Sequence, residues 1–315
     1  MRERVVAVVV AWNRRDLLEQ NLTGLAAQTR PLDAVVVIDN ASTDDTAALA
    51  AAHPVVSEVV TLPRNTGGAG GFAAGIARAV TTHAADLVWI MDDDTVPTAT
   101  ALAELTSARA RYPGHVTIAA SRADWHDGRE HPMNTPRPRL GASRADRARA
   151  ALAGGYPVRS ASFVSILVDA DAIRRHGLPV ADYFLWNDDF EYTTRLLRRG
   201  VGLYVPASRV YHLTKVFGSS DADPGPRFVN EVRNKAWLFT RSDALGPVDR
   251  TLYAASTLRR WARMLRRSDD RAALAGYGRR GLAEARHAPR ATVEVLAATP
   301  VADDVRAVET GAGRG

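Results

Sequence analysis

Three consecutive aspartates, Asp92, Asp93 and Asp94, follow the apolar run VWIM at residues 88–91. If this run is a β-strand, side chains two residues apart face the same side, so Asp92 and Asp94 converge while Asp93 points away. Two convergent carboxylates with little positive charge nearby are typical ligands of Mg²⁺ or Mn²⁺. We therefore predict a divalent-metal site here. The alternative is that the aspartates cap a helix that starts near Pro97.

A second acidic group, Asp188, Asp189 and Glu191, lies in the segment FLWNDDFEYTTRL (184–196). The segment is predicted to begin a helix, whose dipole tolerates negative charge at its first turn. A carboxylate beside Phe184 and Trp186 is expected to have a raised pKa and could act as a general base toward a hydroxyl. Ordinary capping of an exposed helix explains the same residues equally well.

The stretch RNTGGAGGFAAG (64–75) places five glycines between a predicted strand and a predicted helix. Glycines at such a position let backbone N–H groups approach an anion. Gly68, Gly70 and Ala73 also satisfy the G-x-G-x-x-G/A pattern of dinucleotide-binding proteins, but the intervening residues 63–66 separate them from the strand. A structural turn is the alternative interpretation.

His212 ends a short apolar stretch in VYHLTK (210–215). A single histidine is more often structural than functional. It gains interest here as a third metal ligand beside Asp94, because neutral imidazole is a common ligand of divalent metals.

The elements that must position these residues alternate between strand and helix in the first half of the chain. β-branched or apolar runs predict strands at 5–11, 34–40, 55–62 and 86–91, and helical patterns lie at 14–28, 41–54 and 70–84. This alternation indicates an α/β fold with a doubly wound, Rossmann-like sheet. Ligands of such sheets lie beyond the carboxyl ends of the strands, where the sequence places Asn13, Asp39, Asn65 and Asp92–Asp94.

The second half is less regular, and we divide the chain into residues 1–115, 116–240 and 241–315. Residues 121–160 are rich in Arg, Pro and Gly and predict a long mobile loop or an insertion. Beyond them we expect a strand at 160–168, a helix at 171–176, a helix from 188 closed by Gly200, and a strand at 201–206. The last segment is expected to be helical and Arg-rich, and to fray from 291 to 315.

Composition excludes several classes of protein. The 315 residues, 46% of them hydrophobic, are enough for a full core, and the absence of cysteine excludes disulfide scaffolds and thiolate metal sites. No stretch reaches the roughly 20 apolar residues of a membrane span. The N-terminal run MRERVVAVVVAWNRRD is better explained as a first strand than as a signal peptide. We expect a cytoplasmic protein.

The net charge of +6 is concentrated in residues 250–290, which hold eleven arginines and three acidic residues. A helix over 254–267 would place Ala254, Leu258, Trp261 and Leu265 on one stripe. Its other side would carry Arg259, Arg260, Arg263, Arg266 and Arg267. Such a helix either lies on an anionic membrane surface or packs its apolar stripe on the protein body.

Taken in order, the motifs AWNRRD, VVVIDNASTDDT, RNTGGAGGFAAG, WIMDDDTVP, YFLWNDDFEYTTRL and VYH resemble family 2 glycosyltransferases of the GT-A fold. The resemblance covers about residues 4–240 and is strongest to bacterial rhamnosyl- and galactofuranosyltransferases. It implies a GT-A core with an acceptor-side half and a helical C-terminal extension.

The resemblance also implies roles for individual residues. The nucleotide base and ribose would be bound by Ala11, Trp12, Arg14 and Asp39, and the rest of the donor pocket would contain Asn65, Gly67 and Gly68. The D-x-D pair would be Asp92, near the ribose or the metal's waters, and Asp94 on the metal, with His212 completing the site. By the same resemblance, Asp93 and Trp186 would contact the substrate. Arg233 in VRNKAWL (232–238) would contact the diphosphate or the acceptor.

The implied reaction is an inverting transfer from UDP-galactofuranose or dTDP-rhamnose to a hydroxyl of a glycan or a lipid-linked acceptor, with Mg²⁺ or Mn²⁺ as cofactor. Asp189 would be the general base, Asp188 and Glu191 its neighbours in the motif. Because NDDFE replaces the commoner E-D-x-D, Asp188 is an alternative base. The basic segment would bring the enzyme to the inner face of the plasma membrane, and no nucleic-acid partner is expected.

Three other functions are weighed against this one. A nicotinamide-dependent oxidoreductase would use the glycine stretch and leave the aspartates without a role. A non-catalytic protein would bind membrane or nucleic acid through residues 250–290. A sugar nucleotidyltransferase would need a glycine-rich first loop that VVVAWNRRD lacks. The oligomeric state is not specified by the sequence.

Overall fold

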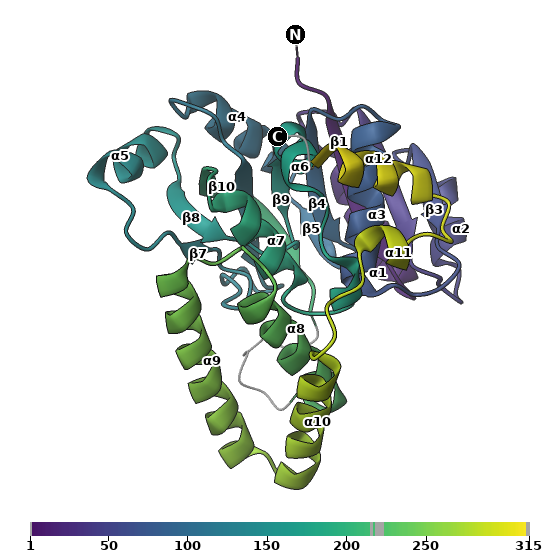
Figure 1. Cartoon of the computed structure of the whole chain (residues 1–315). Helices are drawn as coiled ribbons and strands as arrows, with labels where there is room; N and C mark the ends of the chain where they lie inside the picture. The colour runs from purple at the N-terminus through teal and green to yellow at the C-terminus, as the bar shows by residue number, and fades with distance from the viewer. Residues whose placement is uncertain (1, 215–216, 218–223, 313–315) are drawn as a thin grey trace.

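The computed structural model describes residues 2–214, 217 and 224–312. Its strands form a ten-stranded sheet in the order β3-β2-β1-β4-β9-β6-β10-β8-β7, and β5 pairs with β10 (Figure 1). Lys215, the last residue of the VYHLTK stretch, lies outside the described residues. The strands are β1 (Val5–Ala11), β2 (Ala34–Asp39), β3 (Glu58–Thr61), β4 (Leu87–Asp92), β5 (Thr95–Pro97), β6 (Ile118–Asp124), β7 (Arg137–Pro138), β8 (Tyr156–Ser160), β9 (Ile166–Asp169) and β10 (Gly202–His212).

The first half of the chain folds as the alternation predicts. Strands β3, β2, β1 and β4 are parallel, and helices α1 (Arg15–Ala26), α2 (Thr46–Ala52) and α3 (Gly67–Thr81) connect them. Every residue of β1 and β2 is buried, because helices cover both faces of the sheet. The doubly wound α/β architecture is therefore confirmed. The carboxyl ends of β1, β2 and β4 meet at one edge.

The second half corrects two predictions. The expected strand at 160–168 is wrong, because β8 and β9 are separate strands with β6 and β10 between them. Phe163 and Val164 lie in the segment that connects the two strands and are also buried. The sequence therefore shows an uninterrupted apolar run, which explains why one continuous strand was predicted. The expected mobile loop at 121–160 contains most of β6, all of β7 and β8, and helix α5 (Arg144–Leu152), which begins with a Ser143–Asp146 capping box.

Two further boundaries differ from expectation. Helix α4 (Ala101–Arg111) begins after β5 with Thr100 as its N-cap residue, so the aspartates do not cap it. Helix α7 (Asp188–Leu197) ends before Gly200, and the predicted strand at 201–206 continues through His212 as β10. The helix at 171–176 is present as α6 (Ala170–His176).

The C-terminal segment has two parts. Helices α9 (Pro247–Arg267) and α10 (Arg271–Glu284) project from the body beside α8 (Phe228–Thr240) (Figure 1). The chain then returns through α11 (Thr292–Val295) to α12 (Ala302–Ala312), which packs against α3 and α6. Val301, Val305 and Val308 of this return segment are buried in the main core. The expected fraying from 291 is thus wrong for residues 291–312, and 313–315 lie outside the described residues.

Helix α9 packs differently from the predicted stripe. Trp261 and Leu265 contact α8 and α10 in an apolar cluster, whereas Leu258 is 61% exposed. Arg260, predicted to face away from the body, pairs with Glu231 of α8. No helix among the described residues is long and apolar enough to cross a membrane.

Candidate active site

The first acidic group forms a cluster with a histidine at the carboxyl edge of the sheet. Ligand atoms of Asp92, Asp94 and His212 lie within 4.8 Å of one another, and we call these residues the carboxylate cluster. Asp93 and Asp94 form a turn between β4 and β5, and β5 pairs with β10 so that Thr95 faces His212. The predicted convergence is present, but a turn and an antiparallel strand pair create it rather than strand alternation.

Positive charge lies closer to this cluster than the sequence suggested. The Arg14 guanidinium contacts Asp94 and lies 3.5 Å from Asp93, so the expectation of little nearby positive charge is wrong. Asp93 is buried, and one of its oxygens accepts the backbone N–H of Trp12 at 3.2 Å. It therefore faces the end of β1.

The pKa values of the three aspartates reflect their burial. Burial, with the charge of Asp94, raises the pKa of Asp92 to about 7. Burial also raises the pKa of Asp93 to about 8. Burial acts in the same direction on Asp94, but the adjacent basic groups His212 and Arg14 outweigh it and lower its pKa. A bound divalent cation would favour the ionised form of all three groups.

The atoms of the carboxylate cluster fit a divalent cation. His212 Nδ1 lies 2.9 Å from Asn134 Oδ1, and the Asn134 amide nitrogen donates to Ser162 Oγ at 3.3 Å. A neutral His212 that donates to Asn134 turns its Nε2 lone pair toward Asp94 Oδ1, 3.1 Å away. That oxygen is buried and receives no hydrogen bond from the described residues while His212 is neutral, whereas a protonated His212 would donate to it. A cation or a proton must therefore lie between the two acceptor atoms.

The second acidic group follows a strained loop, residues 181–187, which we call the clamped loop. Phe184 has φ 63° and ψ −62°, and Leu185 N–H donates to Tyr183 O at 2.7 Å, which together define a γ-turn of the rare, strained type. Trp186 and Asn187 also have positive φ, 69° and 65°. Such conformations cost about 1–3 kcal/mol each and persist only where surrounding contacts hold them.

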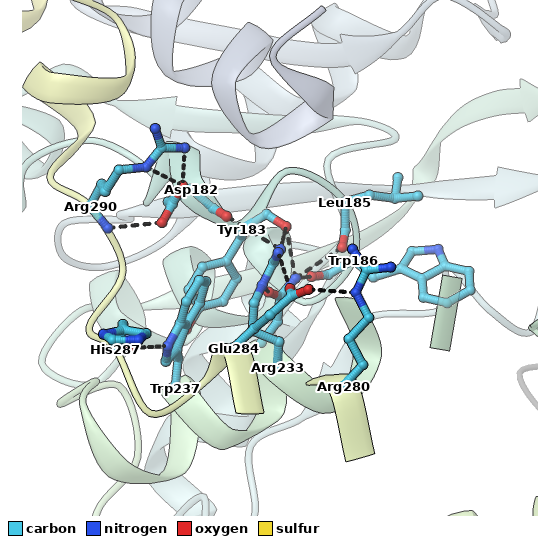
Figure 2. Close-up of polar contacts among 11 residues, drawn as sticks. Asp182, Tyr183, Leu185, Trp186, Arg233, Trp237, Arg280, Glu284, His287 and Arg290 are labelled. Carbon is cyan, nitrogen blue, oxygen red and sulfur yellow. Dashed lines mark hydrogen bonds and ion pairs between the residues drawn. The ribbon is translucent and has the colours of Figure 1, made fainter. Parts of the chain in front are cut away.

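Helix α8 supplies those contacts. The Asn234 amide nitrogen donates to the carbonyl oxygens of Tyr183, Leu185 and Trp186 at 2.9, 3.0 and 2.8 Å. Arg233 donates to Tyr183 O at 3.0 Å and pairs with Glu284 of α10 at 3.3 Å (Figure 2). The Arg233 side chain is 14% exposed and occupied by these contacts. The structure thus gives Arg233 a structural role, and its predicted contact with diphosphate or acceptor stays a prediction.

Of the three acidic residues at the start of α7, Asp189 lines a pocket. This pocket also contains Asn134, Asn187 and Lys235. Asp188 is buried and does not line it, and its pKa is raised well above the ordinary value by burial and by Asp189. Burial also raises the pKa of Asp189, whose Oδ1 accepts the Phe190 N–H at 2.6 Å. This arrangement favours Asp189 over Asp188 as a base.

Glu191 is directed elsewhere. Its carboxylate pairs with Arg195 at 2.9 Å and accepts the Ser242 hydroxyl at 2.8 Å. These contacts give Glu191 a structural role, and its predicted membership of the catalytic group stays a prediction.

The glycine stretch lies inside helix α3 rather than in a loop. Cβ atoms at Gly71 and Gly75 would overlap the side chains of Val10 and Val8, so these glycines allow close packing of α3 on the sheet. A Cβ at Gly67, whose φ is +70°, would overlap the carbonyl oxygen of Phe184. Gly71 and Gly75 therefore serve packing rather than an anion, and Gly67 permits contact with the clamped loop. An anion site at the start of α3, where Gly67 and Gly68 lie, stays a prediction.

The other predicted donor-site residues gather at the ends of the first strands. Ala11 and Asp39 end β1 and β2, and Trp12 is 50% exposed beside them. Asn65 accepts the Gly67 N–H at 2.7 Å, and Gly68 follows in the first turn of α3. The structure thus brings these residues to the same edge as the carboxylate cluster.

Four residues of this region were not singled out from the sequence. Buried Asn40 joins β2 to the start of α3, accepting from Thr66 N–H at 2.8 Å and donating to Gly67 O at 2.9 Å. Its position directly after the second strand was a usable signal. Asn134, Asn234 and Lys235 carried no comparable signal, because their importance depends on partners distant in the sequence.

Comparison with known proteins adds the following. The profile of the family described as "Glycosyltransferase like family 2" matches residues 3–233. Galactofuranosyltransferase GlfT1 of Mycobacterium tuberculosis is 29% identical over 260 residues, covering 76% of this chain and 84% of that protein. The protein of the same name in Mycolicibacterium smegmatis is 30% identical over 203 residues, covering 63% and 67%.

Solved structures share the fold. S. aureus TarS 1-349 in complex with UDP-GlcNAc has a TM-score of 0.62 at 16% identity, covering 98% of this chain and 90% of that one. Mannosyltransferase PcManGT from Pyrobaculum calidifontis, in complex with GDP-Man and Mn²⁺, has a TM-score of 0.52 at 18% identity, covering 100% and 88%. At these identities the likeness concerns the fold alone.

Proposed function

Because this chain belongs to the family 2 glycosyltransferases and is a GT-A enzyme, we propose that it catalyses an inverting, metal-dependent transfer of a sugar from a nucleoside-diphosphate donor to an acceptor hydroxyl. Family membership removes the oxidoreductase, nucleotidyltransferase and non-catalytic alternatives. The observation that carries the proposal is the carboxylate cluster beside the donor-site strand ends, with Asp189 in an adjoining pocket.

The carboxylate cluster would act on the leaving group, and Asp189 would act on the nucleophile. Asp92, Asp94 and His212 would hold the divalent ion, and Asn134 would keep His212 Nε2 directed at it. The chemistry that Mg²⁺ or Mn²⁺ would supply there is neutralisation of negative charge on the departing nucleoside diphosphate. Asp189 would accept the proton of the acceptor hydroxyl as that oxygen attacks the anomeric carbon, and its raised pKa strengthens it as a base.

For the donor we favour UDP-galactofuranose over dTDP-rhamnose. The relatives with 29–30% identity are galactofuranosyltransferases. Trp12, Asp39 and the start of α3 would bind the nucleotide at the strand ends, with Arg14 directed toward the phosphates. By the same relationship, the acceptor would be a glycan or lipid-linked glycan of the cell envelope.

Helix α9 offers a surface for peripheral membrane contact. Val248, Leu252 and Leu258 are 73%, 57% and 61% exposed, and Arg259 is exposed beside them. Exposed apolar side chains next to arginines suit the interface of an anionic bilayer, so we place the enzyme at the cytoplasmic face of the plasma membrane. Flotation with anionic liposomes should recover the wild type but not an Arg259→Glu/Arg266→Glu/Arg267→Glu variant. Equal recovery of both would contradict the membrane contact.

A thermal-shift comparison of UDP-galactofuranose and dTDP-rhamnose, each with Mn²⁺ or with EDTA, tests the donor proposal. UDP-galactofuranose should raise the melting temperature only with Mn²⁺, and Asp94→Asn should abolish that shift. A shift of the same size in EDTA would contradict a metal-dependent donor site. A larger shift with dTDP-rhamnose would reassign the donor. Sugar transfer to a glycan acceptor, assayed with the preferred donor, then tests the reaction itself.

A further inference from the structure

Three basic side chains surround the ring of Phe190, the residue after Asp189. Lys235 Nζ lies 4.8 Å from the ring centre, and the guanidinium carbons of Arg137 and Arg159 lie 5.6 and 6.0 Å away. They come from α8, β7 and β8, which are distant in the sequence. Cation–ring contacts hold them together, with Tyr253 of α9 as the second ring of the cluster.

These cations have too few anionic partners. Lys235 is 7% exposed, yet within the described ranges neither Lys235 nor Arg137 has a carboxylate oxygen within 4.0 Å. Arg159 pairs with Asp249 at 3.2 Å, but its Nε and Nη2 are buried without a hydrogen-bond partner in the described part of the chain. Burying charge without a partner is costly, so buried Lys235 is suited to receive negative charge from a ligand, whereas Arg137 is exposed and open to one.

The nearest carboxylate on α8 does not supply it. Glu231 lies one turn before Lys235, but its oxygens contact Arg260, Trp261 Nε1 at 3.2 Å and the Asn187 amide at 2.8 Å. Burial and the neighbouring arginines lower the pKa of Lys235 to about 8. Lys235 is also one of only two lysines among the 41 Lys and Arg residues of the sequence, so a lysine at this site is an exception in a chain that otherwise uses arginine.

The pocket that contains Asp189 opens onto this cluster. Lys235 and Arg137 line it together with Asp189, and Ser160, Ser162 and Asn134 supply further polar groups. A ligand that places a hydroxyl at Asp189 would therefore place its adjacent groups against two cations.

We propose that this pocket is an anion subsite of the acceptor site, and that the acceptor carries a phosphate or diphosphate ester bound by Lys235 and Arg137. The inference rests on the proposed function, since Asp189 marks the acceptor side. Phosphate fits because it is multiply charged and accepts hydrogen bonds from both an ammonium and a guanidinium. Lys235 and Arg137 also act on Asp189, where their positive charge opposes the rise in its pKa that burial causes. Binding of an added anion therefore distinguishes the subsite from a role limited to Asp189.

Calorimetric titration with inorganic diphosphate tests the subsite on the metal-free full chain in EDTA. Without metal, the carboxylate cluster repels the anion, so binding reports on the basic pocket. Lys235→Met should weaken binding at least about tenfold, the loss expected for one charge-assisted hydrogen bond. Lys235→Arg should restore it. The matched control is Arg306→Gln, which removes one exposed positive charge on α12 and should change nothing.

Two further measurements separate the subsite from the donor site and from the reaction. The affinity for UDP with Mn²⁺ should be the same in Lys235→Met and wild type, because the donor diphosphate binds elsewhere. Asp189→Asn should lose sugar transfer but keep diphosphate binding, so failure of the reaction and failure of the subsite are distinguishable. Flotation with phosphatidylcholine vesicles assigns the ester: Lys235-dependent flotation only with a lipid diphosphate supports a lipid-linked ester, and binding without flotation supports a soluble one.

The proposal is overturned if Lys235→Met binds diphosphate as tightly as wild type while its thermal unfolding is unchanged. It is equally overturned if Arg306→Gln weakens binding as much, which would show general electrostatic attraction. A tenfold loss of UDP affinity in Lys235→Met would assign the lysine to the donor diphosphate instead.

Discussion

The carboxylate cluster and the clamped loop solve different problems. The cluster gathers charge at strand ends, and its unfavourable term is electrostatic: burial and the charge of Asp94 both raise the pKa of Asp92. The clamped loop has an unfavourable backbone, with positive φ at Phe184, Trp186 and Asn187, and distant side chains on α8 hold it. The carboxylate cluster is therefore suited to bind a cation, whereas the conformation of the clamped loop positions Asp189.

The largest effect should come from the residue that the clamped loop positions. Asp189→Asn should reduce turnover by roughly 10²–10⁴-fold, because an amide cannot accept the acceptor proton. Mn²⁺ and UDP affinity should be unchanged, since the carboxylate cluster is intact. Asp188→Asn is the matched comparison and should reduce turnover far less, because Asp188 does not line the pocket. The reverse ranking in a turnover assay would assign the base to Asp188.

Asn234→Ala should break the clamped loop without touching the cluster. Three carbonyl oxygens would lose their shared donor, and a buried unsatisfied group costs about 1–3 kcal/mol. We expect a loss of unfolding free energy in that range, measured by urea denaturation, together with a lower kcat and an unchanged Mn²⁺ affinity. Thr240→Ala, at the exposed end of the same helix, serves as the control. A stable Asn234→Ala protein with wild-type kcat would show that the loop needs no clamp.

Asn134→Ala should weaken metal binding by the carboxylate cluster. Losing the group that orients a metal-binding histidine typically costs 10–100-fold in metal affinity, and we expect about this loss in Mn²⁺ titrations. Asn134→Asp keeps an acceptor oxygen and should retain the affinity. Equal affinities in wild type and Asn134→Ala would mean that His212 is not held by Asn134 in the metal-bound protein.

The last prediction concerns how the stability of the metal-free protein depends on pH. In metal-free protein, burial raises the pKa values of Asp92 and Asp93 from 3.8 to about 7 and about 8, so the folded state binds their protons more tightly than the unfolded state. Their contribution to stability is therefore greatest below the unfolded pKa and is lost as pH rises through 7 to 8. Denaturation in EDTA should show this decline, and Asp92→Asn/Asp93→Asn should flatten it. A wild-type profile that rises over this interval would contradict the predicted shifts.

The two regions also differ in how much of them the sequence predicts. Asp92 and Asp94 were identified because they follow directly after an apolar strand pattern, which is visible in a single sequence. That they converge through a turn and the β5–β10 pair was not visible there. The roles of Arg233 and Asn234 were not, because their partners are carbonyl oxygens about 50 residues away, which have no side-chain signature. Arg14 was expected at the nucleotide, but its contact with Asp94 depends on how the end of β1 faces the β4–β5 turn.

Local pattern by itself determined the alternating strands, the doubly wound class, the position of the aspartates at a strand end and the acidic start of α7. These follow from the burial period of strands and helices, which each segment encodes independently of the others. Only the tertiary structure decided the tautomer-setting contact of Asn134, the clamp on residues 181–187 and the basic cluster around Phe190. Each of these depends on side chains from elements that meet only after the chain has folded, so no local pattern records them.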